Sequence, residues 1–137
     1  MHITEDVIYH LSKNVKTKIG VSSIDGIGVF AIKDIKKDEQ VFPIWEGDSF
    51  MYAIPNERLS DIPTEVLELL DMYFINDDFG FKIIRLFKGM NFLFHGTSFC
   101  NSAWPNKEDT NIDITGIALR DIKAGEEILE WYTKNIN

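Results

Sequence analysis

The sequence predicts a mostly β domain of the α+β class with one main helix. Short apolar runs separated by turn-forming residues extend over most of the 137 residues, a pattern typical of short β-strands. One segment carries an apolar stripe at helical spacing, and one strand–turn–strand phrase occurs twice. The length fits a single domain over residues 1–137, and a hydrophobic content of 45% is enough to fill a core.

The first part of the chain alternates apolar runs with turn formers. Strands are expected over 15–23 (VKTKIGVSS), 28–34 (GVFAIKD) and 39–45 (EQVFPIW), because the intervening stretches SSIDGIG and DIKKDE favour turns. Residues 45–63 follow neither the helical nor the strand period and are expected to be irregular.

The main helix is expected over 64–77 (TEVLELLDMYFIND), directly after Pro63, a residue that suits a helix start. Its apolar stripe consists of Val66, Leu67, Leu69, Leu70, Tyr73 and Phe74. The rest of the chain is expected to form strands over 79–87, 90–94, 112–121 and 126–132, with a polar loop over 100–111.

The repeated phrase is AIKDIKKDEQV at 31–41 and ALRDIKAGEEI at 118–128, with five of eleven positions identical. In each copy, polar turn residues separate two apolar flanks. Two copies this far apart do not make a solenoid, which needs adjacent repeats. The pattern therefore indicates two similar hairpin-like units in one domain.

The charge and the cysteine content limit the possible functions. The formal net charge of −8 offers no basic footprint for phosphate, so direct nucleic-acid binding is not expected. An acidic protein suits a Lys/Arg-rich peptide partner, although solubility alone also explains the charge. The single cysteine, Cys100, excludes a disulfide within the chain and a zinc site made only of cysteines. His2, His10 and His95 lack metal-ligand spacing, so no metal site is expected.

No apolar run approaches the roughly 20 residues of a membrane span. The N-terminal stretch MHITEDVIYHLSKNV has acidic residues and polar breaks where a signal peptide carries an apolar run. The expected protein is soluble, cytoplasmic or nuclear, and not secreted.

Two stretches carry a resemblance to a known family. SSIDGIGVFAIKDIKKDEQVF, at 22–42, resembles the opening of a SET domain, the lysine methyltransferase module, and ALRDIKAGEEILEWY, at 118–132, resembles its end. The resemblance covers 15–44 and 112–132 and is weak between them. It implies a SET-like fold of short curved β-sheets with one main helix, in which the C-terminal segment threads beneath a loop as a pseudoknot.

A third family motif, Asn-His-Ser-x-x-Pro-Asn, is altered in SFCNSAWPNKEDTN. An ungapped alignment matches Ser102, Pro105 and Asn106 but puts Cys100 at the asparagine and Asn101 at the histidine. The alternative makes Asn101 the motif's asparagine and Ser102 the replacement for its histidine, with Asn106 or Asn111 ending the loop. The second alignment is preferred because the order Phe99-Cys100-Asn101 matches the aromatic-x-Asn that precedes the motif. The missing histidine puts cofactor affinity in question.

The resemblance implies methyl transfer from S-adenosylmethionine to the amine of a protein lysine, in a protein or peptide such as a histone. The alternative is a SET-like binding module without activity. A lysine with a pKa of about 10.4 must lose its proton first, which costs about 4.6 kcal/mol at pH 7. An apolar channel walled by aromatic rings lowers that cost. The family's zinc-binding tail is not expected here, so a second copy in a homodimer completes the channel or it stays open.

The residues that the resemblance assigns have ordinary structural alternatives. The cofactor residues are Gly26, Ile27, Gly28, Asn101 and Ser102; the catalytic residue is Tyr132; the channel residues are Tyr73 and Trp131. The glycines could simply form a turn and Asn101 could cap one, while Tyr132, Trp131 and Tyr73 could be core residues.

Two other pairs of reactive side chains are expected to be structural. Glu126 and Glu127 are adjacent, so on a strand they point to opposite faces and cannot easily share an acid–base site. Cys100 and His95 could suggest a thiol nucleophile, but nothing in the sequence orients the pair and buried structural cysteines are commoner.

Overall fold

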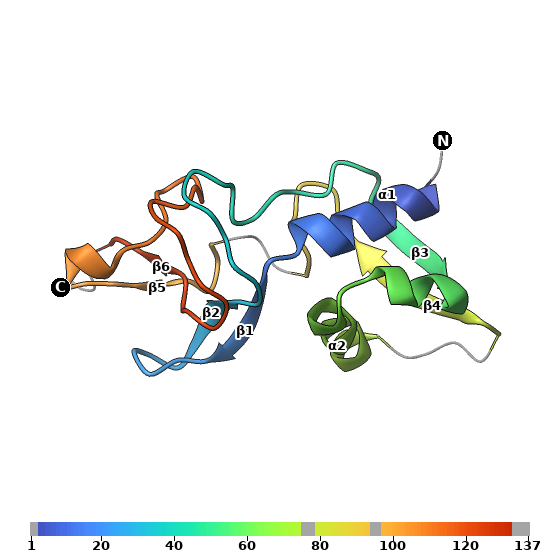
Figure 1. The fold of residues 1–137 in the computed structure, drawn as a ribbon, viewed down its shortest axis with the longest axis horizontal. Coiled ribbons are helices and arrows are strands. Elements are labelled where there is room, and N and C mark those ends of the chain that lie inside the picture. The colour runs from blue at the N-terminus through green and yellow to red at the C-terminus, as the bar shows by residue number, and fades with distance from the viewer. Residues whose placement is uncertain (1–2, 75–78, 94–96, 133–137) are drawn as a thin grey trace. The chain divides into compact units, whose positions relative to one another are not determined.

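A computed structural model describes residues 3–74, 79–93 and 97–132 (Figure 1). By its contacts the chain divides into two compact units. Unit 1 comprises Met1–Val15 and Pro43–His95, and unit 2 comprises Lys16–Phe42 and Gly96–Asn137. Short strand pairs with few helices confirm the α+β class. That the chain forms one domain stays a prediction.

Unit 1 begins with a helical segment that the sequence pattern did not predict. Helix α1, Ile3–Tyr9, continues as a π-helical turn, η1, over His10–Asn14. His10 interrupts the apolar stripe in the sequence, yet it is buried. Its Nε2 lies 2.6 Å from the Asn91 carbonyl oxygen and its Nδ1 lies 3.2 Å from Asn14 Nδ2. Because hydrogen bonds allow the polar His10 to be buried in the apolar face, the apolar pattern in the sequence is interrupted there, and the helix was not predicted.

Helix α2, Thr64–Tyr73, confirms the main helix and its start after Pro63. Val66, Leu69 and Leu70 form its buried face. The expected residues 75–77 lie outside the described residues. A short 3-10 helix, η2, over Asn56–Asp61 precedes α2.

Strands β3, Phe50–Pro55, and β4, Phe81–Leu86, form an antiparallel pair with Phe50 opposite Leu86. The strand expected over 79–87 is confirmed over β4. The irregular structure expected over 45–63 is wrong at β3. Tyr52 and Ile54 alternate with exposed residues there, but Pro55 and the short length obscured the period.

Three other expected strands are corrected by the structure. Residues 39–45 and 112–121 contribute only isolated bridges, Gln40 to Ile117 and Ile112 to Ala118. Residues 91–93 form a bend, and residue 94 lies outside the described residues. These apolar runs bury side chains without a continuous neighbouring strand, so composition alone overestimated their regularity.

Unit 2 contains the antiparallel strands β1, Thr17–Val21, and β2, Ile27–Ala31, which confirm the first two expected strands. It also contains a parallel pair, β5, Asn101–Ser102, and β6, Leu129–Glu130. A 3-10 turn, η3, spans Lys107–Asp109. The loop expected over 100–111 and the strand expected over 126–132 therefore contain shorter strand segments than composition indicated.

The C-terminal segment of unit 2 is bonded to several separate segments. The Ile128 N–H donates to the Val29 carbonyl, and the Leu129 N–H donates to Asn111 Oδ1. Asn111 Nδ2 in turn donates to the Glu127 carbonyl at 2.8 Å. These bonds fix the segment between β2 and the loop after β5. The pseudoknot itself stays a prediction.

The two copies of the repeated phrase pair with each other in unit 2. Ile35 and Ile122 exchange two backbone hydrogen bonds of 2.7 Å each. Around them the contacts come in equivalent pairs, because each bond from one copy has a counterpart from the other. The Ala31 N–H donates to the Glu126 carbonyl and the Ala118 N–H donates to the Glu39 carbonyl, both at 2.9 Å. The copies are thus related by a local twofold pseudosymmetry.

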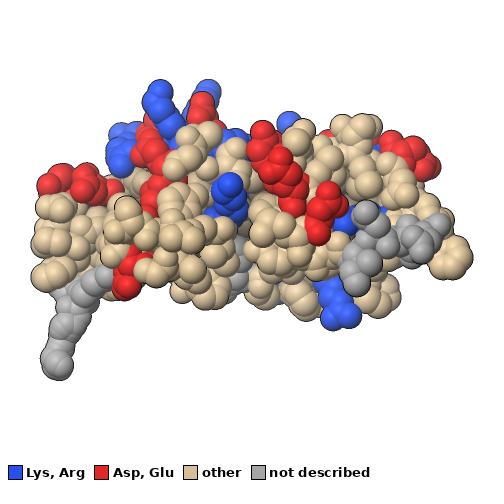
Figure 2. Space-filling model, turned by 90° about the horizontal axis from the view of Figure 1, so that it is seen from below, with Lys and Arg blue, Asp and Glu red and all other residues tan. Residues whose placement is uncertain are grey.

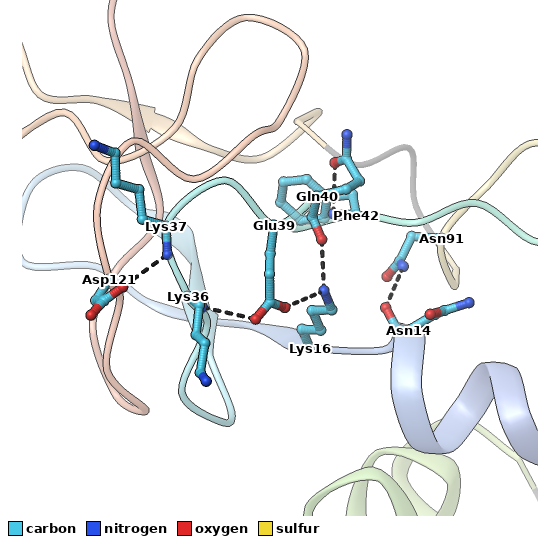
Figure 3. Close-up of polar contacts among 9 residues, drawn as sticks. All are labelled: Asn14, Lys16, Lys36, Lys37, Glu39, Gln40, Phe42, Asn91 and Asp121. Atoms are coloured by element: carbon cyan, nitrogen blue, oxygen red, sulfur yellow. Dashed lines mark hydrogen bonds and ion pairs between the residues drawn. The ribbon is translucent and has the colours of Figure 1, made fainter.

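The aspartates that the two copies of the phrase share follow the same symmetry. Asp121 Oδ1 accepts from the Lys37 N–H, and Asp34 Oδ1 accepts from the Ala124 N–H, both at 2.9 Å. Figure 3 shows the first of these bonds and, beside it, Lys16 donating to Glu39. Each aspartate therefore serves the opposite copy, which explains why both phrases contain one.

On the face shown in Figure 2, Lys and Arg side chains lie beside Asp and Glu side chains mainly toward the upper edge, and other residues make up most of the face. Over the part of the chain that the structure describes, no helix is long and apolar enough to cross a membrane.

Candidate functional site

A cavity of about 280 Å³ in unit 2 is lined by residues 25–27, residues 98–101 and Tyr132. It brings together the sequence-predicted Gly26, Ile27, Asn101 and Tyr132 from the β1–β2 loop, β5 and the chain's last described residue. Gly28 and Ser102 follow directly after lining residues. Four of the eight predicted site residues therefore line one cavity, and the roles assigned to all eight stay predictions.

The two glycines of the loop have different roles. Gly26 has a φ of +48°, which favours glycine, and its carbonyl accepts from the Ser22 N–H at 3.0 Å. A Cβ at Gly26 would have no atom within 4 Å, so open space adjoins it. A Cβ at Gly28 would lie 2.2 Å from Glu127 Oε2. Gly28 is needed because a carboxylate of the same chain packs against it.

Asn101 holds the loop in place and is 8% exposed. Its Nδ2 lies 3.1 Å from the carbonyl oxygens of Asp25 and Ile27 and 2.8 Å from Glu127 Oε2. Among the described residues no hydrogen bond reaches Asn101 Oδ1. The amide therefore fixes the loop with its donor and leaves its acceptor for a ligand.

Ser102, which stands where the preferred alignment places the family's histidine, is fully buried. Its Oγ donates to the Tyr132 carbonyl and accepts from the N–H groups of Tyr132, at 3.0 Å, and Trp104, at 3.1 Å. A serine hydroxyl has one donor and two acceptor positions, so all three are used. Its contact with a cofactor stays a prediction, whereas its side chain clamps the backbone of Tyr132.

Tyr132 is 42% exposed and its hydroxyl donates to the Cys100 carbonyl at 3.2 Å. With its proton directed at that carbonyl, the phenolic oxygen has a lone pair to accept another hydrogen bond. The residue is therefore held at both its backbone and its hydroxyl, with one side open to the cavity.

Neither of the two predicted channel residues lines this cavity. Trp131 lines a neighbouring cavity of unit 2 with Glu130 and Leu119, and Lys107 Nζ lies 5.5 Å from its ring centroid. Tyr73 ends α2 in unit 1, where its ring meets Phe92 edge-on at 6.1 Å. Their roles as channel walls stay predictions.

A larger cavity, of about 550 Å³, lies in unit 1 and is lined by none of the predicted site residues. Trp45, one of its lining residues, makes edge-on ring contacts with His10 and Tyr52. Burial lowers the pKa of His10 and so disfavours the charged ring. We regard this cavity as part of the packing of α1.

Cys100 lines the candidate site, and the surroundings of its thiol disfavour the thiolate that a nucleophile requires. Burial raises its pKa to about 12, and the nearby charges of Glu130 and Glu127 act in the same direction. Burial also raises the pKa of Glu130. His95, the other half of the suggested pair, lies outside the described residues. The described residues contain no group of three side chains that could hold a metal ion.

Sequence reasoning missed the roles of Glu127 and Ser22. Glu127 accepts from Ser22 Oγ at 2.8 and 2.9 Å and from Asn101. Glu126 instead accepts from Arg120 at 3.1 Å and from the Lys123 N–H at 2.9 Å. The two glutamates precede β6 rather than lying on a regular strand, and they bond different partners, so they do not share one site. The sequence offered one signal for the role of Glu127, because the missing side chain of Gly28 permits another group to pack closely against the backbone there.

Comparisons with known proteins identify the family. The family model described as SET domain matches residues 26–133. A search of curated protein sequences finds no match. Among solved structures, a candidate histone methyltransferase of Plasmodium falciparum is 22% identical with a TM-score of 0.39, covering 88% of this chain and 95% of its own. The methyltransferase domain of human PR domain-containing protein 2 is 20% identical with a TM-score of 0.40, covering 90% and 80%. With its family model matched over most of its length, this chain belongs to the SET-domain family.

Proposed function

We propose that the protein is an S-adenosylmethionine-dependent protein-lysine N-methyltransferase. One observation carries the proposal. Tyr132 lines the same cavity as the glycine loop and Asn101, and the clamp by Ser102 together with the bond from its hydroxyl to the Cys100 carbonyl holds it there. Family membership supports the same reaction.

The residues around the cavity fit the cofactor. Open space next to Gly26 leaves room for a ligand against the backbone, and Asn101 Oδ1 is free to accept from an ammonium group. The cavity volume is near the lower end for small-molecule sites, so it suits the amino-acid and sulfonium end of the cofactor rather than its whole length. When bound, the cofactor supplies a methyl group on a positively charged sulfur.

Tyr132 would orient the substrate amine. Because its hydroxyl proton is directed to the Cys100 carbonyl, its oxygen can accept an N–H of the amine and leave the nitrogen lone pair directed at the methyl group. The lysine must be neutral to attack, and the pKa of its ammonium falls in a poorly solvated channel. Tyr73 and Trp131 are the residues we assign to the walls of that channel.

The substrate we propose is a lysine-bearing protein or peptide, with histone tails as the first to test. The formal net charge of −8 favours basic substrates by long-range attraction. A cytoplasmic or nuclear location and a homodimer that completes the channel belong to the same proposal.

The first test is binding of S-adenosylmethionine, measured by calorimetry, followed by transfer of a labelled methyl group to histone peptides. Tyr132→Phe should lower the rate of transfer by about two to four powers of ten, the range for a positioned acid–base group, while cofactor affinity changes little. Tyr9→Phe, at an exposed tyrosine of α1, is the matched control.

Different outcomes separate the candidate functions. A folded Tyr132→Phe protein with undiminished turnover would remove Tyr132 from the active site. No binding of the cofactor at millimolar concentration would favour an inactive SET-like module that binds proteins or peptides.

A further inference from the structure

Glu127 carries a charge that the surrounding side chains do not neutralise. Its carboxylate accepts hydrogen bonds from Ser22 Oγ and Asn101 Nδ2, and both donors are uncharged. Within the described ranges no Lys or Arg side chain forms an ion pair with it. Neutral donors orient the carboxylate but do not compensate its charge.

Glu126, its neighbour in the chain, differs in this respect. Its carboxylate pairs with Arg120 at 3.1 Å and caps the Lys123 N–H. The guanidinium neutralises most of its field at a distance. The two adjacent glutamates therefore carry the same formal charge, but the electric field of Glu127 extends farther than that of Glu126.

The charge of Glu127 lies directly behind the wall of the candidate cofactor cavity. Its Oε2 is 2.8 Å from Asn101 Nδ2, and the same nitrogen bonds the carbonyls of Asp25 and Ile27. All three of these residues line the cavity. The absence of a side chain at Gly28 allows this approach, since a Cβ there would lie 2.2 Å from the carboxylate.

The field of Glu127 reaches the cavity. Cys100 lines it, and the charges of Glu130 and Glu127 add to burial in raising the pKa of its thiol. A negative field disfavours a thiolate and favours a cation in the same place. No Lys or Arg is among the described residues that line the cavity.

We propose that Glu127 is a specificity-determining residue that makes this cavity prefer a cofactor with a positively charged centre over one with a neutral sulfur. The inference rests on the proposed function. S-adenosylmethionine carries a sulfonium, whereas S-adenosylhomocysteine, the product, has lost that charge. Glu127 thus favours retention of the methyl donor and release of the product.

The test measures dissociation constants by calorimetry for three ligands: S-adenosylmethionine, S-adenosylhomocysteine, and sinefungin, in which an amine replaces the methylated sulfonium. The wild-type protein should bind both cationic ligands more tightly than S-adenosylhomocysteine. Glu127→Gln keeps the size of the side chain and removes the charge. It should reduce the preference by about five- to thirtyfold, as expected for loss of one unit charge near a partly solvated wall.

Two control variants separate charge from shape. Glu126→Gln removes the same formal charge at the compensated position, so the preference should stay within twofold. Ser22→Ala removes one donor to Glu127 and keeps its charge, so all three affinities should fall by a similar factor. Thermal melts of each variant confirm folding.

The outcomes are distinguishable. If Glu127→Gln weakens all three ligands equally, the residue only shapes the loop and the charge proposal is wrong. If wild-type protein binds S-adenosylhomocysteine as tightly as both cationic ligands, the proposal is overturned even if the variant does not fold. If none of the ligands binds, the proposed function fails, and this inference with it.

Discussion

Replacement of Ser102 by alanine tests the clamp that holds Tyr132. The change deletes three hydrogen bonds in a fully buried position and leaves the N–H and carbonyl of Tyr132 and the N–H of Trp104 without that partner. Each lost bond costs about 0.5 to 1.5 kcal/mol, so the free energy of unfolding should fall by about 1.5 to 4.5 kcal/mol.

Loss of the Ser102 clamp should also lower the turnover number. A released Tyr132 no longer holds its hydroxyl at the cavity, and a misplacement of about 1 Å can lower a rate by about a hundredfold. We expect kcat to fall while the KM for the cofactor changes little, because the loop held by Asn101 is untouched. Urea denaturation gives the stability, and transfer of a labelled methyl group to a peptide gives the rate.

Two further variants make the result specific. Ser102→Cys fills the same volume with a weak hydrogen-bonding group and should reproduce the kinetic loss. Ser60→Ala, at an exposed serine of η2, should change neither quantity. A Ser102→Ala protein with unchanged stability and unchanged kcat would refute the clamp.

Three more predictions follow from other contacts. Asp34→Ala and Asp121→Ala each remove one equivalent bond between the repeated phrases, so each should lower the free energy of unfolding, measured in urea, by about 1 kcal/mol; a difference above about 2 kcal/mol between them would contradict the symmetry. Lys82→Met should lower the free energy of unfolding by about 1 to 3 kcal/mol, because the buried ammonium bonds Asp71 and the Phe74 carbonyl at the end of α2. A melting temperature equal to that of the wild type would contradict this. With a pKa of about 12, Cys100 should react with iodoacetamide at pH 8 far more slowly in the folded protein than in urea, and faster as the pH rises; labelling at equal rates would show that the thiol is not protected.

Local patterns predicted the elements whose signal lies within one segment. The stripe of α2 and the start after Pro63 are visible in ten consecutive residues, and β1, β2 and β4 are apolar runs with turn formers beside them. The helical segment formed by α1 and η1 was missed because buried His10, the first residue of η1, is satisfied by Asn91, a residue 81 positions away. No local pattern can contain that partner.

In the candidate site too, local motifs indicated some residues, whereas the roles of others depend on partners far away in the sequence. The motifs indicated Asn101 and Tyr132, and the structure places both at one cavity. The side-chain role of Ser102 depends on Tyr132, 30 residues later, and that of Glu127 depends on Ser22, 105 residues earlier. Such roles come from tertiary packing, so residue type and spacing alone could not predict them.

The pairing between the repeated phrases has a consequence for assembly. Each phrase presents its backbone and its aspartate to a partner of nearly the same sequence, and nothing in the pairing requires both to come from one chain. Residues 31–41 of one molecule can therefore pair with residues 118–128 of another, which is the condition for domain swapping. Within one chain, the two phrases meet only when the residues between them close into a loop, and this closure costs conformational entropy. Refolding at high protein concentration should therefore yield exchanged dimers that keep these hydrogen bonds, and dilution during refolding should suppress them.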